Sequence, residues 1–351
     1  MSQRQAEERG LSIQKKTLDA KNMERQLIIL HVDRVKMLID EKFLNVNAQD
    51  DRRGNTYPQR LCYNIGRGGK LSDNEMDVFR LYLETPDFNV NSKNIDGSTL
   101  IHTAIQDVGD DRILDCILKY AHNLDANIQY GIITNASAGH DHDNNDHDDQ
   151  DPHNRSPLQC SIQLRHIRPI ASKISILLDE NNNINVVRRG GQRVNVNIQN
   201  WLGETPLYTI LKKFSYYETF YESDVKVIKW LIDAKADPNI PRFIEGGTPL
   251  HVLAGLSHEN MSPYVEQIAD YMLMRGLADP INIKVENGLS AVDIAEKKSN
   301  NAFLRSVHKW RIRQSVLERT LRVHGSQFSR LSPDIHKHIS GFVAASTELR
   351  L

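Results

Sequence analysis

One short pattern recurs along this chain of 351 residues, and it constrains the fold more than any other feature. A glycine or asparagine, followed two residues later by threonine or serine, opens an apolar stretch at Gly54, Gly97, Asn154, Gly203, Gly246 and Gly288. A second marker, a turn asparagine, recurs at Asn47, Asn91, Asn127, Asn197, Asn239 and Asn282. The glycine-type markers are spaced by 43, 57, 49, 43 and 42 residues. Two markers that stay in step predict a repeated structural unit.

The residues between the markers follow two helical patterns. In one stretch, apolar residues follow Val225 at steps of three, six and seven, at Ile228, Leu231 and Ile232. This spacing places all four on one helix face. Each unit is therefore expected to contain a turn, a short helix, a loop, a second helix and an extended hairpin. Helical pairs that bury their faces only against neighbouring pairs form an all-α solenoid, and solenoids mostly act as binding surfaces.

The repeated sequence resembles the ankyrin repeat over residues 24–302. The matching positions are Thr99, His102 and Ala104, then Thr205, Pro206 and Leu207, then Thr248, Pro249, Leu250 and His251, and last Ser290, Ala291, Asp293 and Ala295. The resemblance implies an all-α ankyrin-repeat solenoid of five to six units that binds a client protein. Ankyrin units run to about 33 residues, so the extra length here predicts enlarged inter-helix loops at 212–223 and 255–264.

Composition and charge narrow the class of protein. The net charge of −1 gives no global field for nucleic acid, and no apolar run approaches the roughly 18 residues that a membrane span needs. The three cysteines, Cys62, Cys116 and Cys160, contain no CxxC pair. With no signal-peptide pattern at the start, we expect a cytoplasmic monomer with neither disulfides nor a bound metal or cofactor.

Four features could suggest chemistry, and each has a simpler interpretation. His102 and His251 are replaced at equivalent positions by Gln159, Tyr208 and Asp293, which indicates a structural turn position and not a catalytic one. The GRGGK segment at 66–70 lacks two required positions of a phosphate loop. The RRGG segment at 188–191 is a single short copy, too little to indicate nucleic-acid binding. The His- and Asp-rich insertion, residues 130–153, could hold a transition metal, but its composition favours a disordered loop.

One aromatic segment is a candidate contact surface for the client. It contains Phe214, Tyr216, Tyr217, Phe220 and Tyr221. Part of such a segment must pack, because large apolar patches are rarely left bare. Tyrosine-rich loops also suit interfaces, because they give contact area at low entropy cost. The sequence leaves both interpretations open.

Two further elements follow the repeats. Residues 303–323 form an expected basic helix whose apolar side, Phe303, Val307, Trp310, Leu317 and Leu321, would cap the last unit. Residues 324–351 then contain a short helical pattern with Ser332 as N-cap and Pro333 at the first position. This segment resembles the start of an F-box at Leu331, Pro333, Asp334, Ile335, Ile339, Phe342 and Val343.

The F-box resemblance implies binding to the adaptor subunit of a cullin-type ubiquitin ligase. Ankyrin arrays with such an ending resemble a group found in poxviruses and intracellular bacteria. The leading hypothesis is thus a non-enzymatic module that binds a client and delivers it to a ubiquitin ligase. The alternative is a secreted bacterial effector that acts in the host-cell cytoplasm by scaffolding or blocking a host protein. The remaining part, residues 1–23, is expected to be a polar N-terminal extension.

Overall fold

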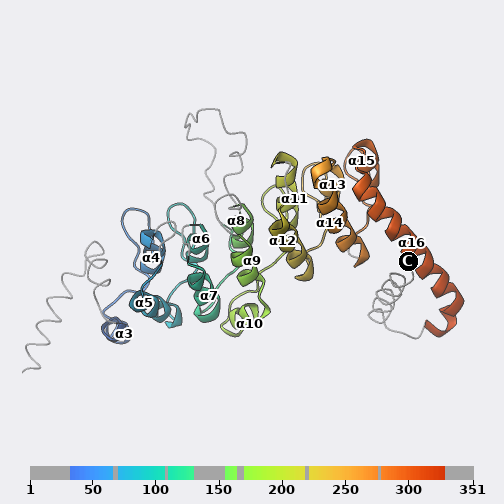
Figure 1. Cartoon of the computed structure of the whole chain (residues 1–351). Helices are drawn as coiled ribbons and strands as arrows, with labels where there is room; N and C mark the ends of the chain where they lie inside the picture. The colour runs from blue at the N-terminus through green and yellow to red at the C-terminus, as the bar shows by residue number, and fades with distance from the viewer. Residues whose placement is uncertain are drawn as a thin grey trace, which may run out of the picture. The chain divides into compact units, whose positions relative to one another are not determined.

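Short apolar helices follow one another in pairs along most of the chain. The computed structural model describes residues 32–65, 70–106, 110–129, 155–163, 170–217, 221–275 and 278–328. Within these ranges the elements are α3 (Val32–Asp40), α4 (Tyr57–Ile65), α5 (Asp73–Glu84), α6 (Leu100–Gln106), α7 (Asp111–Tyr120), α8 (Pro157–Gln163), α9 (Ile170–Leu178), α10 (Glu180–Arg188), α11 (Pro206–Tyr217), α12 (Glu222–Asp233), α13 (Pro249–Gly255), the 3-10 turn η2 (Glu259–Met261), α14 (Ser262–Met274), α15 (Ala291–Lys297) and α16 (Asn301–Phe328) (Figure 1). The described ranges contain three isolated β-bridges and no longer strand, which confirms the all-α class.

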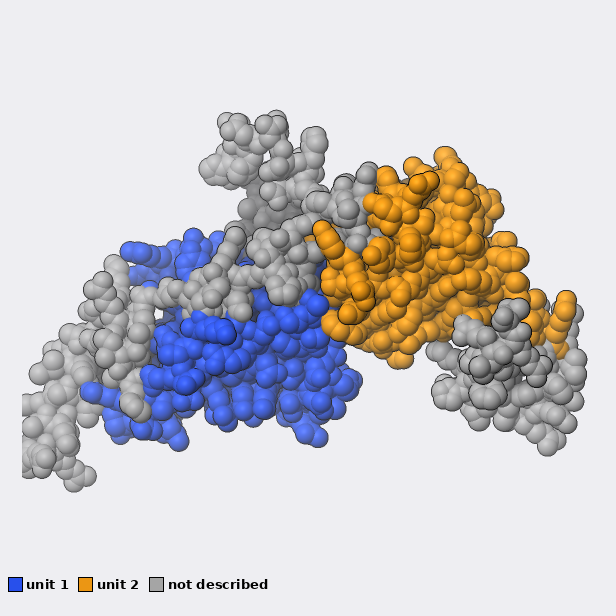
Figure 2. Space-filling view, in the orientation of Figure 1, with its two compact units in different colours: residues 1–195 blue, residues 196–351 orange. Residues whose placement is uncertain are grey.

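The chain divides into two compact units, residues 1–195 and residues 196–351 (Figure 2). In the first, α4, α6 and α8 contact one another in order as one layer, and α3, α5, α7 and α9 form a second. In the second unit, α11, α13 and α15 form one layer, and α12, α14 and α16 form the other. Each unit is therefore a two-layer stack of helical pairs, as expected for ankyrin-type repeats.

The first helix of each repeat starts after a threonine or serine that pairs with the residue three positions later. The backbone N–H of Thr56 donates to the side chain of Gln59 at 2.8 Å, and that of Ser156 donates to Gln159 at 3.0 Å. Ser290 and Asp293 cap each other in the same way. Ser156 with Gln159 and Ser290 with Asp293 form complete capping boxes, which satisfy N–H groups that a helix start leaves without a partner. The residue types at these two positions differ among the repeats, but the hydrogen bond from the first residue's N–H to the side chain three positions later is the same.

The marker asparagines join each repeat to the next. The Asn91 amide donates to the Asn123 carbonyl at 2.8 Å and accepts from the Asp125 N–H at 2.9 Å. Asn197 makes the same two bonds with the repeat that follows it. One amide side chain has a donor and an acceptor, so it can pair with both backbone groups of a neighbouring turn. The periodic asparagine predicted from the sequence therefore serves as the link between repeats.

The extra length of two repeats is arranged differently from our expectation. The prediction of an enlarged loop over 212–223 is wrong for its first half, because α11 continues through Lys212 to Tyr217. In the segment 255–264, η2 and the first turn of α14 replace much of the expected loop. Met261 anchors this segment, since its side chain is fully buried. Added length is thus absorbed by helix extension and by a buried anchor.

The RRGG segment closes α10 against the preceding repeat. The N–H of Gly191 donates to the Val186 carbonyl, and the N–H of Asn123 donates to the Arg189 carbonyl. A Cβ at Gly191 would lie 2.5 Å from the Leu124 carbonyl oxygen, so no larger residue fits there without movement. This glycine is required by a close backbone approach, and its role is structural.

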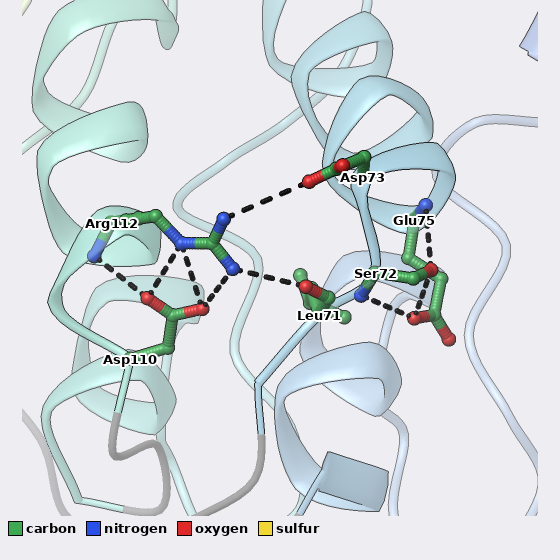
Figure 3. Close-up of polar contacts among 6 residues, drawn as sticks. All are labelled: Leu71, Ser72, Asp73, Glu75, Asp110 and Arg112. Atoms are coloured by element: carbon green, nitrogen blue, oxygen red, sulfur yellow. Dashed lines mark hydrogen bonds and ion pairs between the residues drawn. The ribbon is translucent and has the colours of Figure 1, made fainter.

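The arginine that follows the α6–α7 connection joins two neighbouring helix starts. The Arg112 guanidinium forms a 2.7 Å ion pair with the buried carboxylate of Asp110 and donates to the Leu71 carbonyl at 3.0 Å (Figure 3). Hydrogen bonds from Arg112 lower the pKa of Asp110. Leu71 precedes Ser72, which caps α5 together with Glu75. The cluster therefore fixes α7 relative to the start of α5.

Helix α16 packs against the last two helices before it in the second unit. Phe303 and Val307 are buried, and α16 contacts both α14 and α15. Asn300, which precedes the helix, donates to the carbonyls of Leu253, Ala254 and Leu256 at 2.8–3.2 Å. The helix begins at Asn301 and ends at Phe328, so it is longer than the predicted 303–323.

The basic character of α16 is partly neutralised by acidic residues of the second unit. Arg305 and Lys309 pair with Glu266 at 2.7 and 2.9 Å, and Lys309 also pairs with Asp270 at 2.8 Å. These bonds from Arg305 and Lys309 lower the pKa of Glu266. Two cations of α16 therefore pair with acidic groups of α14 at exposed positions.

Candidate functional site: the exposed hairpin tips

The hairpins between repeats end in turns that are fixed by the marker glycines. Positive φ angles between 66° and 81° occur at Gly54, Gly97, Gly203, Gly246 and Gly288. This left-handed conformation is easily adopted by glycine and rarely by other residues. The turn predicted from the glycine spacing is thus confirmed at these five positions.

Neighbouring tips are joined by backbone hydrogen bonds. In the second unit, the Phe243 N–H donates to the Leu202 carbonyl at 2.9 Å, and the Glu286 N–H donates to the Glu245 carbonyl at 3.0 Å. The first unit has the equivalent bond from Ile95 to Arg53 at 2.9 Å. Each row of tips is therefore held in register, and the side chains on it have fixed neighbours.

Three large apolar side chains are exposed on two adjacent tips of the second unit. Trp201 is 50% exposed, Phe243 is 65% exposed and Ile244 is 51% exposed. We call these residues the tip cluster. The Phe243 ring lies directly against Gly203, where an added Cβ would be 2.7 Å from two ring carbons. The ring is thus positioned before any partner arrives, and little side-chain freedom remains to be lost on binding.

Charged and polar groups surround the tip cluster. Glu245 is exposed and lies 3.8 Å from Arg242, whose guanidinium also donates to the Tyr208 hydroxyl at 3.5 Å. Below the turn, the buried carboxylate of Glu204 pairs with Lys212 at 2.8 Å. The site is therefore apolar at its tips, with charged groups at its edge and base.

The tips of the first unit differ in composition. Ile95 is 59% exposed at the position equivalent to Trp201. Beside it, Arg53 lies 3.8 Å from Asp96 and 4.8 Å from the centre of the Tyr63 ring. One apolar side chain next to a locally paired cation is a smaller candidate than the tip cluster.

The aromatic segment predicted to contact a client is divided by the structure. Phe214 is fully buried, so its assignment to the contact surface is wrong, because its ring fills the core of the second unit. Tyr221 is 61% exposed, and its assignment to the contact surface stays a prediction. Tyr216 and Tyr217 belong to the last turn of α11, with side chains outside the described part, and Phe220 lies outside the described residues.

The buried histidine of the second repeat has a structural role. His102 Nδ1 lies 2.9 Å from the Thr99 hydroxyl, and its Nε2 lies 3.2 Å from the Arg155 carbonyl. Gln59 bonds Thr56 and the Ser98 carbonyl at the equivalent places. Burial lowers the pKa of His102 to about 4. Both nitrogens contact groups that hold repeats together, so this imidazole belongs to the fold.

Several predicted features fall outside the described residues. These are the F-box-like positions Leu331, Pro333, Ile335, Ile339, Phe342 and Val343, the insertion at 130–153, and the extension at 1–23. Among the residues that the structure describes, no group of three His, Cys, Asp or Glu side chains could hold a metal ion. Within the same residues, no helix is both long and apolar enough to span a bilayer.

Sequence reasoning missed the tip cluster, although its signal was present. Trp201 and Ile244 each stand two residues before a marker glycine, and Phe243 stands three before. A large apolar residue at the exposed position of a tight turn is unusual, since such turns favour small polar residues. Comparing the residues that precede each marker glycine would have revealed it.

Comparisons with known proteins identify structural neighbours only. No protein-family model matches the chain, and no curated protein sequence matches it. The crystal structure of EF0377, an ankyrin repeat protein, matches with 16% identity and a TM-score of 0.39, covering 79% of this chain and 91% of that chain. The ankyrin repeat domain of Bcl-3, described as a unique member of the IkappaB protein family, matches with 14% identity and a TM-score of 0.49, covering 78% and 91%. The human ASB11 ankyrin repeat domain matches with 18% identity and a TM-score of 0.43, covering 78% and 92%.

Proposed function

We propose that this chain is a protein-binding module that holds a client protein on the tip cluster of its second unit. The observation that carries this proposal is the exposure of Trp201, Phe243 and Ile244 on two hydrogen-bonded tips. Tryptophan and other large side chains dominate the free energy of many protein interfaces. The module acts by binding and without catalysis. Tyr221 is a further candidate contact for the client, whereas the buried Phe214 is no longer a candidate.

A comparison of co-purifying proteins tests this proposal. The full chain and a Trp201→Ser/Phe243→Ser/Ile244→Ser variant would be used to capture proteins from a lysate, followed by quantitative mass spectrometry. We expect at least one protein to be recovered with the parent chain and lost with the triple variant. A matched control, Val187→Ser, removes an apolar side chain that is 49% exposed on α10 and should keep the same proteins. Equal recovery by all three chains would reject the tip cluster as the site.

The F-box-like segment supports a second function, delivery of the client to a cullin-type ubiquitin ligase. Its apolar residues Leu331, Ile335, Ile339 and Phe342 recur at steps of four, four and three, which would form one stripe on a short helix. The second unit has its own cap in α16, so this stripe is not needed to close the repeats. Burial of such a stripe in an adaptor groove would give a micromolar interaction.

Adaptor capture by two versions of the chain tests the ligase function. A truncation after Phe328 removes the segment and leaves the whole of α16 in place. We expect the full chain to capture the adaptor subunit and the truncated chain to fail. An Ile335→Asp/Ile339→Asp variant of the full chain should fail as well. Equal capture by every version, or capture by none, would remove the ligase function.

The alternative is a secreted bacterial effector that blocks or scaffolds a host protein without ligase recruitment. The polar composition of the insertion at 130–153 favours this alternative. A translocation reporter fused to about the last thirty residues would distinguish the two functions. Reporter transfer without adaptor capture supports the effector, and adaptor capture without transfer supports the ligase function.

A further inference from the structure

The chemistry around the tip cluster narrows the class of client, and this inference rests on the proposed function. The tip next to Ile244 ends in Glu245, whose side chain is 71% exposed. On the following tip, Glu286 is exposed, and its backbone N–H bonds the Glu245 carbonyl. Two carboxylates therefore stand on neighbouring tips at one side of the three apolar side chains.

The nearby cations offset the charge of these two carboxylates only in part. Arg242 is only 17% exposed, and its guanidinium is shared between the Tyr208 hydroxyl and a 3.8 Å contact with Glu245. Lys284 lies on the stem of the next hairpin, beside Ser290 and the helix start at Asp293. The solvent-facing charge at the tips themselves is thus carried by Glu245 and Glu286.

The backbone at Glu245 adds a second observation. Its φ of 65° places a non-glycine residue in the left-handed region. In the described tips at Arg53, Asp96, Leu202 and Asn287, which hold the equivalent position, no such angle occurs. This conformation is unfavourable for a residue that carries a Cβ. A carboxylate is therefore held at this tip although glycine or asparagine would fit the turn better.

We propose that the second unit binds a protein segment in which large apolar side chains lie next to lysine or arginine. The apolar side chains lie against Trp201, Phe243 and Ile244, and the cations face Glu245 and Glu286. The tips place the two groups side by side, because Phe243, Ile244 and Glu245 share one tip, Trp201 lies on the tip before it and Glu286 on the tip after it. An apolar anchor with charges at its rim is a common arrangement in interfaces.

Peptide selection on the full chain tests the proposal. A displayed library of random twelve-residue peptides would be selected on the parent chain, and enriched peptides would be synthesised and measured by fluorescence anisotropy. We expect the enriched peptides to combine Trp, Phe or Leu with Lys or Arg. Trp201→Ser and Phe243→Ser should each weaken binding about 30-fold or more. Glu245→Asn with Glu286→Gln should weaken it about 5- to 10-fold and reduce its dependence on salt.

The outcomes separate this proposal from the proposed function. Peptides that need Trp201 and Phe243, but carry no cations and ignore the carboxylate variant, would overturn the inference and leave the binding site intact. Binding that survives both serine variants, or a selection that enriches nothing, would overturn the site as well. Sedimentation of the chain alone supplies a further outcome. A dimer of the parent chain that dissociates in Phe243→Ser would show a second copy covering the cluster, and would overturn the proposal.

Discussion

At the scale of single residues, one position of the repeat shows how different side chains perform the same task. Gln59 and His102 each contact the hydroxyl residue that starts their own helix and a carbonyl of the following repeat. Glutamine does this at any pH, whereas histidine does it only while neutral. The substitution therefore adds a dependence on pH that the glutamine repeats lack.

The first prediction follows from the lowered pKa of His102, which is about 4 in the folded chain. The unfolded chain takes up this proton below about pH 6.5, so acid favours unfolding and stability falls between about pH 6.5 and 4. From pH 7 to pH 5 the loss from this residue is about 2 kcal/mol. In His102→Gln, urea unfolding should show a pH 7 to pH 5 difference smaller by about 2 kcal/mol. An unchanged difference would mean that His102 is charged in the fold or already exposed.

The second prediction concerns the positive φ of Glu245. Asparagine tolerates this conformation better than glutamate, so Glu245→Asn should raise the free energy of unfolding by about 0.5–1 kcal/mol. Urea unfolding of the parent and variant measures this change. Ile244→Asn, one residue earlier and at negative φ, is the control and should bring no such gain. A destabilised Glu245→Asn would indicate that the glutamate side chain contributes to the fold.

At the scale of helices and hairpins, local rules predicted much of the structure and tertiary contacts determined the rest. Glycine turns, capping residues and apolar stripes are short-range signals, so the hairpins and helix starts could be predicted. The burial of Phe214 could not be predicted in this way. It depends on the extension of α11 by another turn, and that extension depends on the residues against which the side chains of α11 pack. The tip cluster, in contrast, could have been predicted, because its large apolar residues stand just before two marker glycines.

The third prediction tests the asparagine link between repeats. Asn91→Ala removes the bonds to the Asn123 carbonyl and the Asp125 N–H. Two hydrogen bonds at a partly exposed site contribute about 1–3 kcal/mol together. Urea unfolding should show this loss, with faster amide exchange at Asp125. Asn181→Ala, at an exposed position of α10, is the matched control and should stay within about 0.5 kcal/mol of the parent. Equal effects of both substitutions would contradict a linking role.

At the scale of the whole molecule, repeat stacking makes every pair depend on its neighbours. A unit without a cap leaves one apolar face of its last pair in water. In the second unit α16 meets this need through its buried Phe303 and Val307. Asn300, which precedes α16, adds hydrogen bonds to three carbonyls at the C-terminal end of α13. The ion pairs of α16 with α14 are exposed and add less. The cap is thus mainly an apolar element.

The fourth prediction follows from that balance. Phe303→Ala should destabilise the second unit by about 3–5 kcal/mol, because it leaves a cavity between α16 and its neighbours. Arg305→Ala, which removes only an exposed ion pair, should cost about 1 kcal/mol or less. Hydrogen exchange measures both, with faster exchange expected in α13 to α15 for Phe303→Ala. Helices α5 and α7 are the internal reference, because each repeat is stabilised by its immediate neighbours. A larger effect from Arg305→Ala than from Phe303→Ala would mean that charge, and not apolar burial, holds the cap in place.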